Sequence, residues 1–271
     1  MGHISLTDLS QLELPAPPQS LAKISSMLDG DEVNMLRMSQ FIEIDLSLAA
    51  EVMKTVNSPL YGLRGRANHV HQAVTFLGTR EIAALVYQVS LRGAFPGAAE
   101  LQPMWERSAV RALLMGRLAK EIYMDAWCAH TAGLFEECGK AVLFKLAPDT
   151  YRPMLKAAPN DIELAAQEQA TFGISHDVIG ARLCESWGLD AGAVACVRWH
   201  IETLATRRLP TKSPKRAICV ISALVHTLST QPDELEAMAA ALAPQAMLDQ
   251  GQLLKGARRV KQKVDDALAD G

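Results

Sequence analysis

Apolar residues recur at intervals of three and four along nearly the whole chain, and this spacing predicts amphipathic helices. Asp45 is a candidate N-cap, and Pro59 disfavours helical geometry in the residue before it, so one helix is expected between them. No segment alternates with the period of two that is typical of a strand. We therefore predict an all-α fold whose first helices lie over residues 18–29, 33–44, 45–56, 70–77 and 79–92.

The segment RGAFPGAAELQP (92–103) is rich in turn-forming residues and is the best candidate for a boundary between two lobes. Beyond it, the pattern predicts long helices over 103–124 and 127–147, followed by shorter helices that continue to the C-terminus. Asn160, Ser175 and Asp190 are candidate N-caps of three of these. The expected organisation is an N-terminal helical lobe over 12–95, a helical bundle over 101–230 and a C-terminal helical extension over 231–271.

The composition narrows the class of protein. Hydrophobic residues make up 49% of the 271 residues and aromatic residues only 5%, which is typical of a helical globular protein. The formal net charge is −3, so no overall basic field attracts nucleic acid. No apolar run approaches the ~20 residues of a membrane span, and the N-terminus lacks the pattern of a signal peptide. The five cysteines form no C-x-x-C pair. We expect a reduced, cytoplasmic protein.

Several stretches, in the same order, resemble the HDOD family, an output-type relative of the metal-dependent HD phosphohydrolases. The resemblance covers roughly residues 12 to 230. It is found in the segments LPAPPQSLAKISSML, FIEIDLSLAAEVMKTVNSPLYG, HQAVTFLGTREIAALV, WERSAVRALLMGRLA, AGLFEECGKAVL, FGISHDVIGARLCESWGL and VRWH.

The resemblance also implies where a metal site would lie. In relatives that keep HD chemistry, a histidine two residues after a helical Trp, an adjacent His-Asp pair before x-Gly-Lys, and a later aspartate bind the metal. Here Arg107 holds the first position and Glu136-Glu137 the second, and no aspartate lies between Asp190 and Asp233. Arginine has no lone pair to give a metal. We therefore interpret Arg107, Glu136 and Glu137 as the positions of a metal site that has been lost, and expect no cofactor.

The residues alone leave three roles open for the two glutamates, which the pattern places inside the helix predicted over 127–147. The favoured one is a buried ion pair with Arg107 that replaces the metal as the link between the two long helices. The second is simple solvation at a helix surface. The third is a site for Mg²⁺ or Mn²⁺ built from the two carboxylates, which the charge of Arg107 opposes.

Further residues are candidates for contacts with a ligand or a partner. His176-Asp177 is the one His-Asp dipeptide, but it follows Ser175 at a predicted helix start, so local capping is the favoured interpretation. For His200, the favoured interpretation is a partly buried histidine with its hydrogen bonds satisfied. For Arg64 and Arg66, a solvated loop is favoured. The candidate contact residues are Asn57, Tyr61, Arg64, Arg66, Lys140, His176 and His200.

The sequence contains no G-x-S-x-G, P-loop, G-x-G-x-x-G or H-E-x-x-H motif. Together with the altered metal-site positions, this predicts a protein that is not an enzyme. The resemblance implies a regulatory module in bacterial signal transduction, with partners in a two-component or cyclic-dinucleotide pathway. The alternatives are a receptor for a small ligand or nucleotide in the vacated pocket, and a residual metal-dependent phosphohydrolase or phosphodiesterase.

Overall fold

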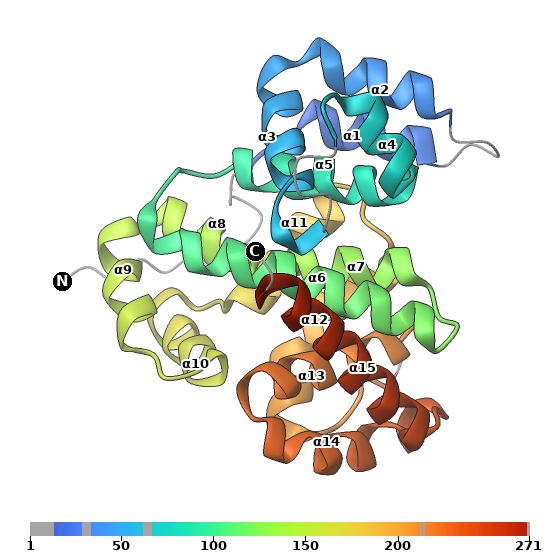
Figure 1. Cartoon of the computed structure of the whole chain (residues 1–271). Helices are drawn as coiled ribbons and strands as arrows, with labels where there is room; N and C mark the ends of the chain where they lie inside the picture. Colours follow the sequence, from blue (N-terminus) through green and yellow to red (C-terminus); the bar gives the residue numbers. More distant parts are fainter. Residues whose placement is uncertain (1–13, 29–33, 62–66, 212, 214, 270–271) are drawn as a thin grey trace. The chain divides into compact units, whose positions relative to one another are not determined.

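The computed structural model describes residues 14–28, 34–61, 67–211, 213 and 215–269. Within these ranges the chain is helical, and no strand occurs (Figure 1). The predicted all-α fold is confirmed. No described helix is both long and apolar enough to cross a membrane.

The chain divides into two compact units, with one boundary between Ala94 and Phe95, inside the turn-rich segment at 92–103. Of the residues that the structure describes, those within 17–94 and 261–271 form the smaller unit, and those within 1–16 and 95–260 form the larger. Residues 231–260 group with the larger unit.

The smaller unit contains the first five α-helices, drawn in blue to teal in Figure 1. Their apolar faces bury Ile24, Met38, Val52, Val74 and Leu85 completely or almost so. Asp45 caps α3 by accepting hydrogen bonds from the backbone N–H groups of Ser47 and Leu48, as predicted. The elements are α1 (Gln19–Leu28), α2 (Met35–Ile44), α3 (Leu46–Val56), η1 (Pro59–Tyr61), α4 (Val70–Leu77) and α5 (Thr79–Gly93).

The larger unit is a bundle built around the packing of α6 against α7 and of α11 against α8 and α12. Its elements are η2 (Ala99–Leu101), α6 (Gln102–Glu121), α7 (Ala126–Phe135), α8 (Cys138–Leu146), α9 (Pro148–Ala157), α10 (Asp161–Phe172), α11 (His176–Ser186), α12 (Ala191–Thr206), α13 (Ala217–Thr230), η3 (Pro232–Glu234), α14 (Leu235–Leu242), η4 (Pro244–Ala246) and the first part of α15 (Gln250–Ala269).

The single helix predicted over 127–147 is wrong. The chain forms α7 and α8 with a turn at Glu136-Glu137 between them, so the two glutamates do not lie inside a helix. Tertiary packing requires this turn. Gly133 lets α7 approach α6 so closely that a Cβ there would lie 3.0 Å from Ala112 Cα, and Gly139 lets α8 approach α11 so that a Cβ would lie 2.0 Å from the carbonyl oxygen of His176. One straight helix could not make both contacts.

The predicted caps have mixed outcomes. Asn160 accepts a hydrogen bond from Glu163 N at 2.9 Å, and Asp190 accepts one from Gly192 N at 2.7 Å, so both predictions are confirmed. Ser175 stands at the N-cap position of α11, but its side chain makes no capping bond. Instead, the Ser175 hydroxyl donates a hydrogen bond to the carboxylate of Asp177. The side chain of Asp177 thus engages the hydroxyl that was expected to cap the helix.

Candidate functional site

Glu136 and Glu137 lie at the centre of a buried cluster of charges. Both carboxylates are 1% exposed, although a charged side chain in the interior is costly unless it is paired. We call this group the ion-pair cluster. It consists of Arg107 and Arg111 from α6, Glu136 and Glu137 from the α7–α8 turn, Lys140 from α8, Asp161 from α10 and Ser222 from α13.

Glu137 is held by three cations. Its Oε2 accepts hydrogen bonds from Arg107 Nη2 at 2.9 Å and from Lys140 Nζ at 2.7 Å. Arg111 Nη2 forms an ion pair with Oε1 at 2.7 Å. Burial by itself raises the pKa of Glu137, but Lys140, Arg111 and Arg107 outweigh this effect and hold the pKa well below its ordinary value. The carboxylate is therefore ionised.

The other members complete the charge balance. Glu136 Oε1 lies 3.4 Å from Arg111 Nε, and its Oε2 accepts a hydrogen bond from the Ser222 hydroxyl at 2.6 Å. Lys140 also donates to Asp161 Oδ1 at 2.7 Å. Three cationic side chains thus face three carboxylates, and the formal charges cancel. The cluster joins α6, the α7–α8 turn with the start of α8, α10 and α13, four regions that are separated in sequence.

The predicted contact between Arg107 and a glutamate is present, but the expectation of a buried pair is only half met. The side chain of Arg107 is 55% exposed, whereas that of Arg111 is 9% exposed. The buried cations that balance the glutamates are Arg111 and Lys140. Sequence reasoning missed Arg111, although it lies one turn from Arg107 on the same face of α6 and the spacing could have indicated it.

These residues do not fit a metal ion of the HD type. Arg107 and Arg111 offer no lone pair, and both carboxylates already bind cationic or hydroxyl groups. Within the described ranges, no group of three or more His, Cys, Asp or Glu side chains could hold a metal. The carboxylates would have to leave their present partners before they could bind one.

His176 and His200 lie in a second buried polar group, which we call the histidine cluster and which also contains Tyr151 and Glu168. Glu168 Oε2 lies 2.7 Å from both the backbone N and Nδ1 of His176, and Glu168 Oε1 accepts a hydrogen bond from the Tyr151 hydroxyl. The rings of His176 and His200 have centroids 5.3 Å apart. Burial lowers the pKa of His200, which favours the neutral imidazole.

His176 and Asp177 lie in the first turn of α11, as the capping interpretation expected, but both also make contacts with other helices. His176 is 0% exposed and reaches Glu168 on α10, and Asp177 forms an ion pair with Arg198 on α12 at 2.7 Å. These are tertiary contacts that sequence spacing does not specify. His200 was expected to be partly buried with its hydrogen bonds satisfied, and this is only half met. The ring is buried and its Nδ1 lies 2.7 Å from the carbonyl oxygen of Val197, but Nε2 has no hydrogen-bond partner among the described residues.

Several candidate contact residues cannot meet a partner at the surface. Lys140, His176 and His200 are each at most 2% exposed, so those predictions are corrected: their polar groups are needed inside the bundle. Asn57 donates hydrogen bonds to the carbonyl oxygens of Met53 and Ala67, which is a loop-fixing role. Tyr61 is half-buried in η1, and Arg64 and Arg66 lie outside the described residues.

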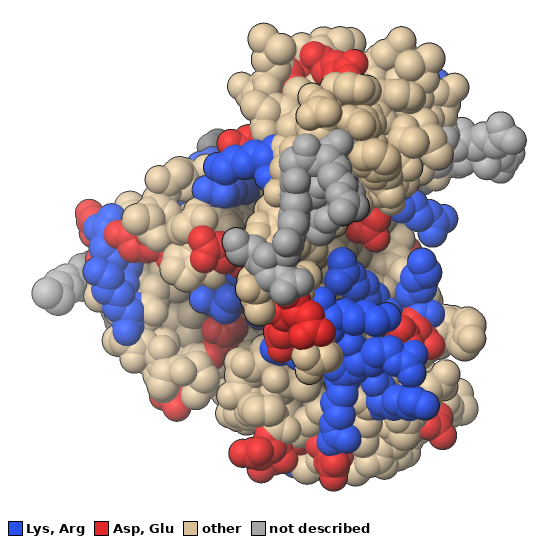
Figure 2. Space-filling model, viewed as in Figure 1, with Lys and Arg blue, Asp and Glu red and all other residues tan. Residues whose placement is uncertain are grey.

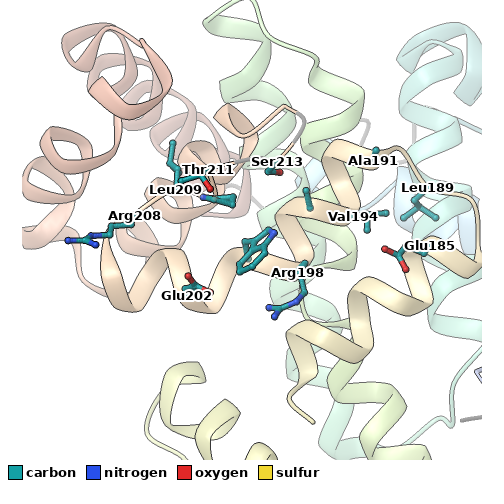
Figure 3. A pocket seen from close by; sticks show the side chains of 13 residues that line it. Glu185, Leu189, Ala191, Val194, Arg198, Glu202, Arg208, Leu209, Thr211 and Ser213 are labelled. Atoms are coloured by element: carbon teal, nitrogen blue, oxygen red, sulfur yellow. The ribbon is translucent and has the colours of Figure 1, made fainter. Parts of the chain in front are cut away.

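A groove of about 750 Å³ lies on the larger unit between the end of α11, α12 and the segment that follows α12. Figure 3 shows Arg208 and Glu185 near opposite ends of this groove, with Val194 and Leu209 between them. Trp199 also lines it, and the guanidinium of Arg198 lies 4.5 Å from the centroid of the Trp199 ring, a cation–π contact. We call this feature the α11–α12 groove.

Lys and Arg side chains gather over α15 on the face shown in Figure 2. Several already have acidic partners: Arg258 lies 2.6 Å from Glu236, and Arg259 lies 3.0 Å from Glu121. Exposed pairs of this kind contribute little to stability and leave little charge unmatched. This surface gives no specific indication of a nucleic-acid site.

Comparison with known proteins places this fold among HD-like helical proteins. The family model for the HDOD domain matches residues 14–203, so the chain belongs to the HDOD family. The match ends before the boundary at 230 that the sequence suggested.

Solved structures agree on the fold. The structure of an HDOD domain protein with unknown function from Geobacter sulfurreducens matches with a TM-score of 0.74 and 18% identity, covering 96% of this chain and 94% of that one. A candidate signal transduction protein from Marinobacter aquaeolei VT8 matches with a TM-score of 0.74 and 20% identity, covering 96% of this chain and 59% of that one. A candidate phosphohydrolase from Shewanella amazonensis matches with a TM-score of 0.71 and 20% identity, covering 98% and 100%.

The curated relatives are longer proteins that match this chain over only part of their length. An uncharacterised protein of Treponema pallidum is 23% identical over 192 residues, which span 69% of this chain but 37% of that protein. The uncharacterised protein YuxH of Bacillus subtilis is 28% identical over 103 residues, or 38% of this chain and 25% of that protein. The matched regions thus span about a third of these relatives or less.

Proposed function

We propose that this chain is a non-catalytic HDOD module that regulates signal transduction in the bacterial cytoplasm by binding other proteins. The observation that carries the proposal is the ion-pair cluster. Arg107, Glu136 and Glu137 stand where the resemblance to HD enzymes implies metal ligands, and a balanced set of ion pairs occupies these positions. A regulatory role is supported by the name of the Marinobacter aquaeolei protein, which describes it as a signal transduction protein. The resemblance to the HDOD family suggests that the partners belong to a two-component or cyclic-dinucleotide pathway.

The α11–α12 groove is the described surface that best meets the needs of a partner site. Trp and Arg are the residues that most often dominate the binding energy of protein interfaces, and this groove offers Trp199, Arg198 and Arg208 beside apolar side chains. Glu185 and Glu202 add the opposite charge, so a partner segment with an apolar centre and charges of both signs would complement it.

The non-catalytic part is tested by metal analysis and hydrolysis assays. Protein purified without chelator should hold far less than one equivalent of Fe, Mn or Zn, and added divalent ions should not raise phosphodiester hydrolysis above background. The triple variant Arg107→His, Glu136→His and Glu137→Asp is the matched comparison. It should bind metal more strongly than the natural chain, though weakly without the distal aspartate. About one equivalent of metal in the natural protein, or metal-dependent turnover, would contradict the proposal.

The interaction part is tested by site-specific photo-crosslinking in the native cell. A photoreactive residue at Glu202, in the groove, should trap a defined partner, and Trp199→Ala should reduce the yield because the aromatic anchor is lost. The same residue placed at Ala170, exposed on α10, is the control. Equal trapping at both positions, or none at Glu202, would count against the groove.

A further inference from the structure

A second cavity lies beside the ion-pair cluster, between α6 and α13. Its volume is about 350 Å³, near the lower end of the range for small-molecule sites. Val110 and Val225 supply apolar wall, and Arg107, Arg111 and His226 supply polar groups. Glu106, Ser229 and Thr230 complete the lining. Small-molecule sites typically combine an apolar lining with a few placed polar groups in this way.

Arg111 is the residue that points to a ligand. Its Nε faces Glu136 and its Nη2 faces Glu137. These two contacts use one edge of the guanidinium. Its Nη1, although buried, has no hydrogen-bond partner among the described residues. A buried donor without a partner costs about 1–3 kcal/mol, so such groups usually bind a water or a ligand. Arg111 also lines the cavity, so the side chain that carries this unpaired donor stands beside a space that a ligand can enter.

The charge at the cavity favours an anion with limited charge. Arg107 contacts Glu137 through Nη2 and is 55% exposed, so the rest of its guanidinium remains accessible at the cavity. Glu106 accepts a hydrogen bond from Gln102 at 2.8 Å and is the one carboxylate in the lining, where it opposes a highly charged ligand. Burial lowers the pKa of His226, and Arg111 lowers it further, which favours a neutral ring that adds no charge of its own.

We propose that the α6–α13 cavity binds a small organic anion. Its phosphate or carboxylate group accepts hydrogen bonds from Arg111 Nη1 and Arg107, and its apolar part packs against Val110 and Val225. Guanidinium groups suit both oxyanions, because their planar N–H donors match the oxygen spacing. The inference goes beyond partner binding and does not depend on it: the cavity is lined by α6 and α13, whereas the groove is lined by α11, α12 and the segment after α12.

The test uses the full chain and three probes that share one ring: phenyl phosphate, benzoate and phenol. Isothermal titration calorimetry should show saturable binding of one or both anions and none of phenol. If phenyl phosphate binds more tightly, the natural group is a phosphate, and if benzoate does, a carboxylate. Arg107→Gln and Ser229→Trp, both at exposed positions, should weaken binding about tenfold or more, through loss of a charged donor and through blocking of the cavity.

Two further variants separate binding from folding. Arg111→Lys keeps the charge for Glu136 and Glu137 but removes Nη1, so it should lose most of the binding while its circular dichroism stays that of the natural chain. Arg259→Gln removes another half-exposed, ion-paired arginine and should bind normally. The proposal is overturned if neither anion binds saturably at millimolar concentration, if phenol binds equally, or if Arg107→Gln and Ser229→Trp both leave binding unchanged. Release of phenol from bound phenyl phosphate would instead contradict the non-catalytic role and leave the anion site standing.

Discussion

The ion-pair cluster around Glu137 and the histidine cluster around Glu168 are both buried in the larger unit, but they satisfy their carboxylates differently. Glu137 faces three cations, one of which, Arg107, reaches solvent. Glu168 is 0% exposed and bonds to a tyrosine hydroxyl and to two nitrogens of His176. The first cluster therefore depends on balanced full charges, and the second on directed hydrogen bonds to neighbouring polar groups.

This difference bears on how each cluster could serve function. A balanced group of charges with one exposed member can respond to an anion or to pH, because neighbouring cations hold the pKa of Glu137 and Asp161 low. The histidine cluster has no exposed member and serves to fix α10, α11 and α12 relative to one another. The comparison predicts that substitutions lower the free energy of unfolding to different extents. Loss of a buried charge should have the largest effect, and loss of a partly exposed ring the smallest.

Arg111→Met should have the largest effect on stability. It leaves Glu136 and Glu137 with too little compensating charge in the interior, which typically costs ~3–5 kcal/mol. Adding Glu136→Gln and Glu137→Gln should recover part of the loss. Urea denaturation monitored by circular dichroism measures both.

Arg107→Met is the matched control for that experiment. Because its side chain is 55% exposed, its removal should cost less than about 1 kcal/mol, as for other exposed pairs. If Arg107→Met and Arg111→Met lose the same free energy of unfolding, exposure does not determine how much each arginine stabilises the protein. The assignment of Arg111 as the buried balancing cation would then be wrong.

Acid should weaken the ion-pair cluster in a defined pH window. Burial alone raises the pKa of Asp161, but Lys140 outweighs this and lowers the pKa from 3.8 to about 2. Because the folded-state pKa is the lower one, the stabilisation is present above about pH 4 and is lost as the pH falls toward 2. The loss from Asp161 should be on the order of 2 kcal/mol. Glu137, whose pKa is also held low, should contribute in the same direction, beginning near its ordinary pKa of 4.5.

Asp161→Asn isolates the contribution of that one carboxylate to acid sensitivity. The variant should be less stable than the natural chain at pH 7 and should lose less stability between pH 4 and pH 2, as followed by urea denaturation at each pH. If the dependence of stability on pH is unchanged in this variant, the Asp161 carboxylate does not contribute to the acid sensitivity of the cluster.

Tyr151→Phe tests the histidine cluster by removing one hydroxyl and keeping the ring. Glu168 Oε1 loses its donor, and a buried acceptor left without a partner typically costs about 1–3 kcal/mol. We expect a loss near the lower bound, since the backbone N–H and ring of His176 still bind Oε2. A loss as large as that in Arg111→Met would erase the distinction between the clusters.

Trp199→Ala should have the smallest effect on stability. The ring is partly exposed in the α11–α12 groove, and surface substitutions usually change stability by less than about 0.5 kcal/mol. Thermal unfolding should therefore be nearly unchanged while crosslinking to a partner falls. A large loss of stability would assign Trp199 to the packing of the bundle.

Local features of the sequence were sufficient for the helices of the smaller unit and for several of their boundaries. The helix expected over 70–77 is α4 (Val70–Leu77), and that over 79–92 is α5 (Thr79–Gly93). The caps at Asp45, Asn160 and Asp190 were equally predictable. Each depends on residues within about one turn, and such spacing can be read along the chain. The family was also recognisable, from the order of its motifs.

Tertiary structure alone decided how the charges pair. The turn at Glu136-Glu137 exists because α7 must meet α6 and α8 must meet α11, and both segments are apolar enough to continue one helix. The sequence identified Arg107 and the two glutamates as altered metal-site positions, but not that Arg111, Lys140 and Asp161 would balance them. Those partners come from segments up to 50 residues apart, between Arg111 and Asp161. Whether a charge is buried depends on the packing of whole helices, and the pattern along one helix does not contain that information.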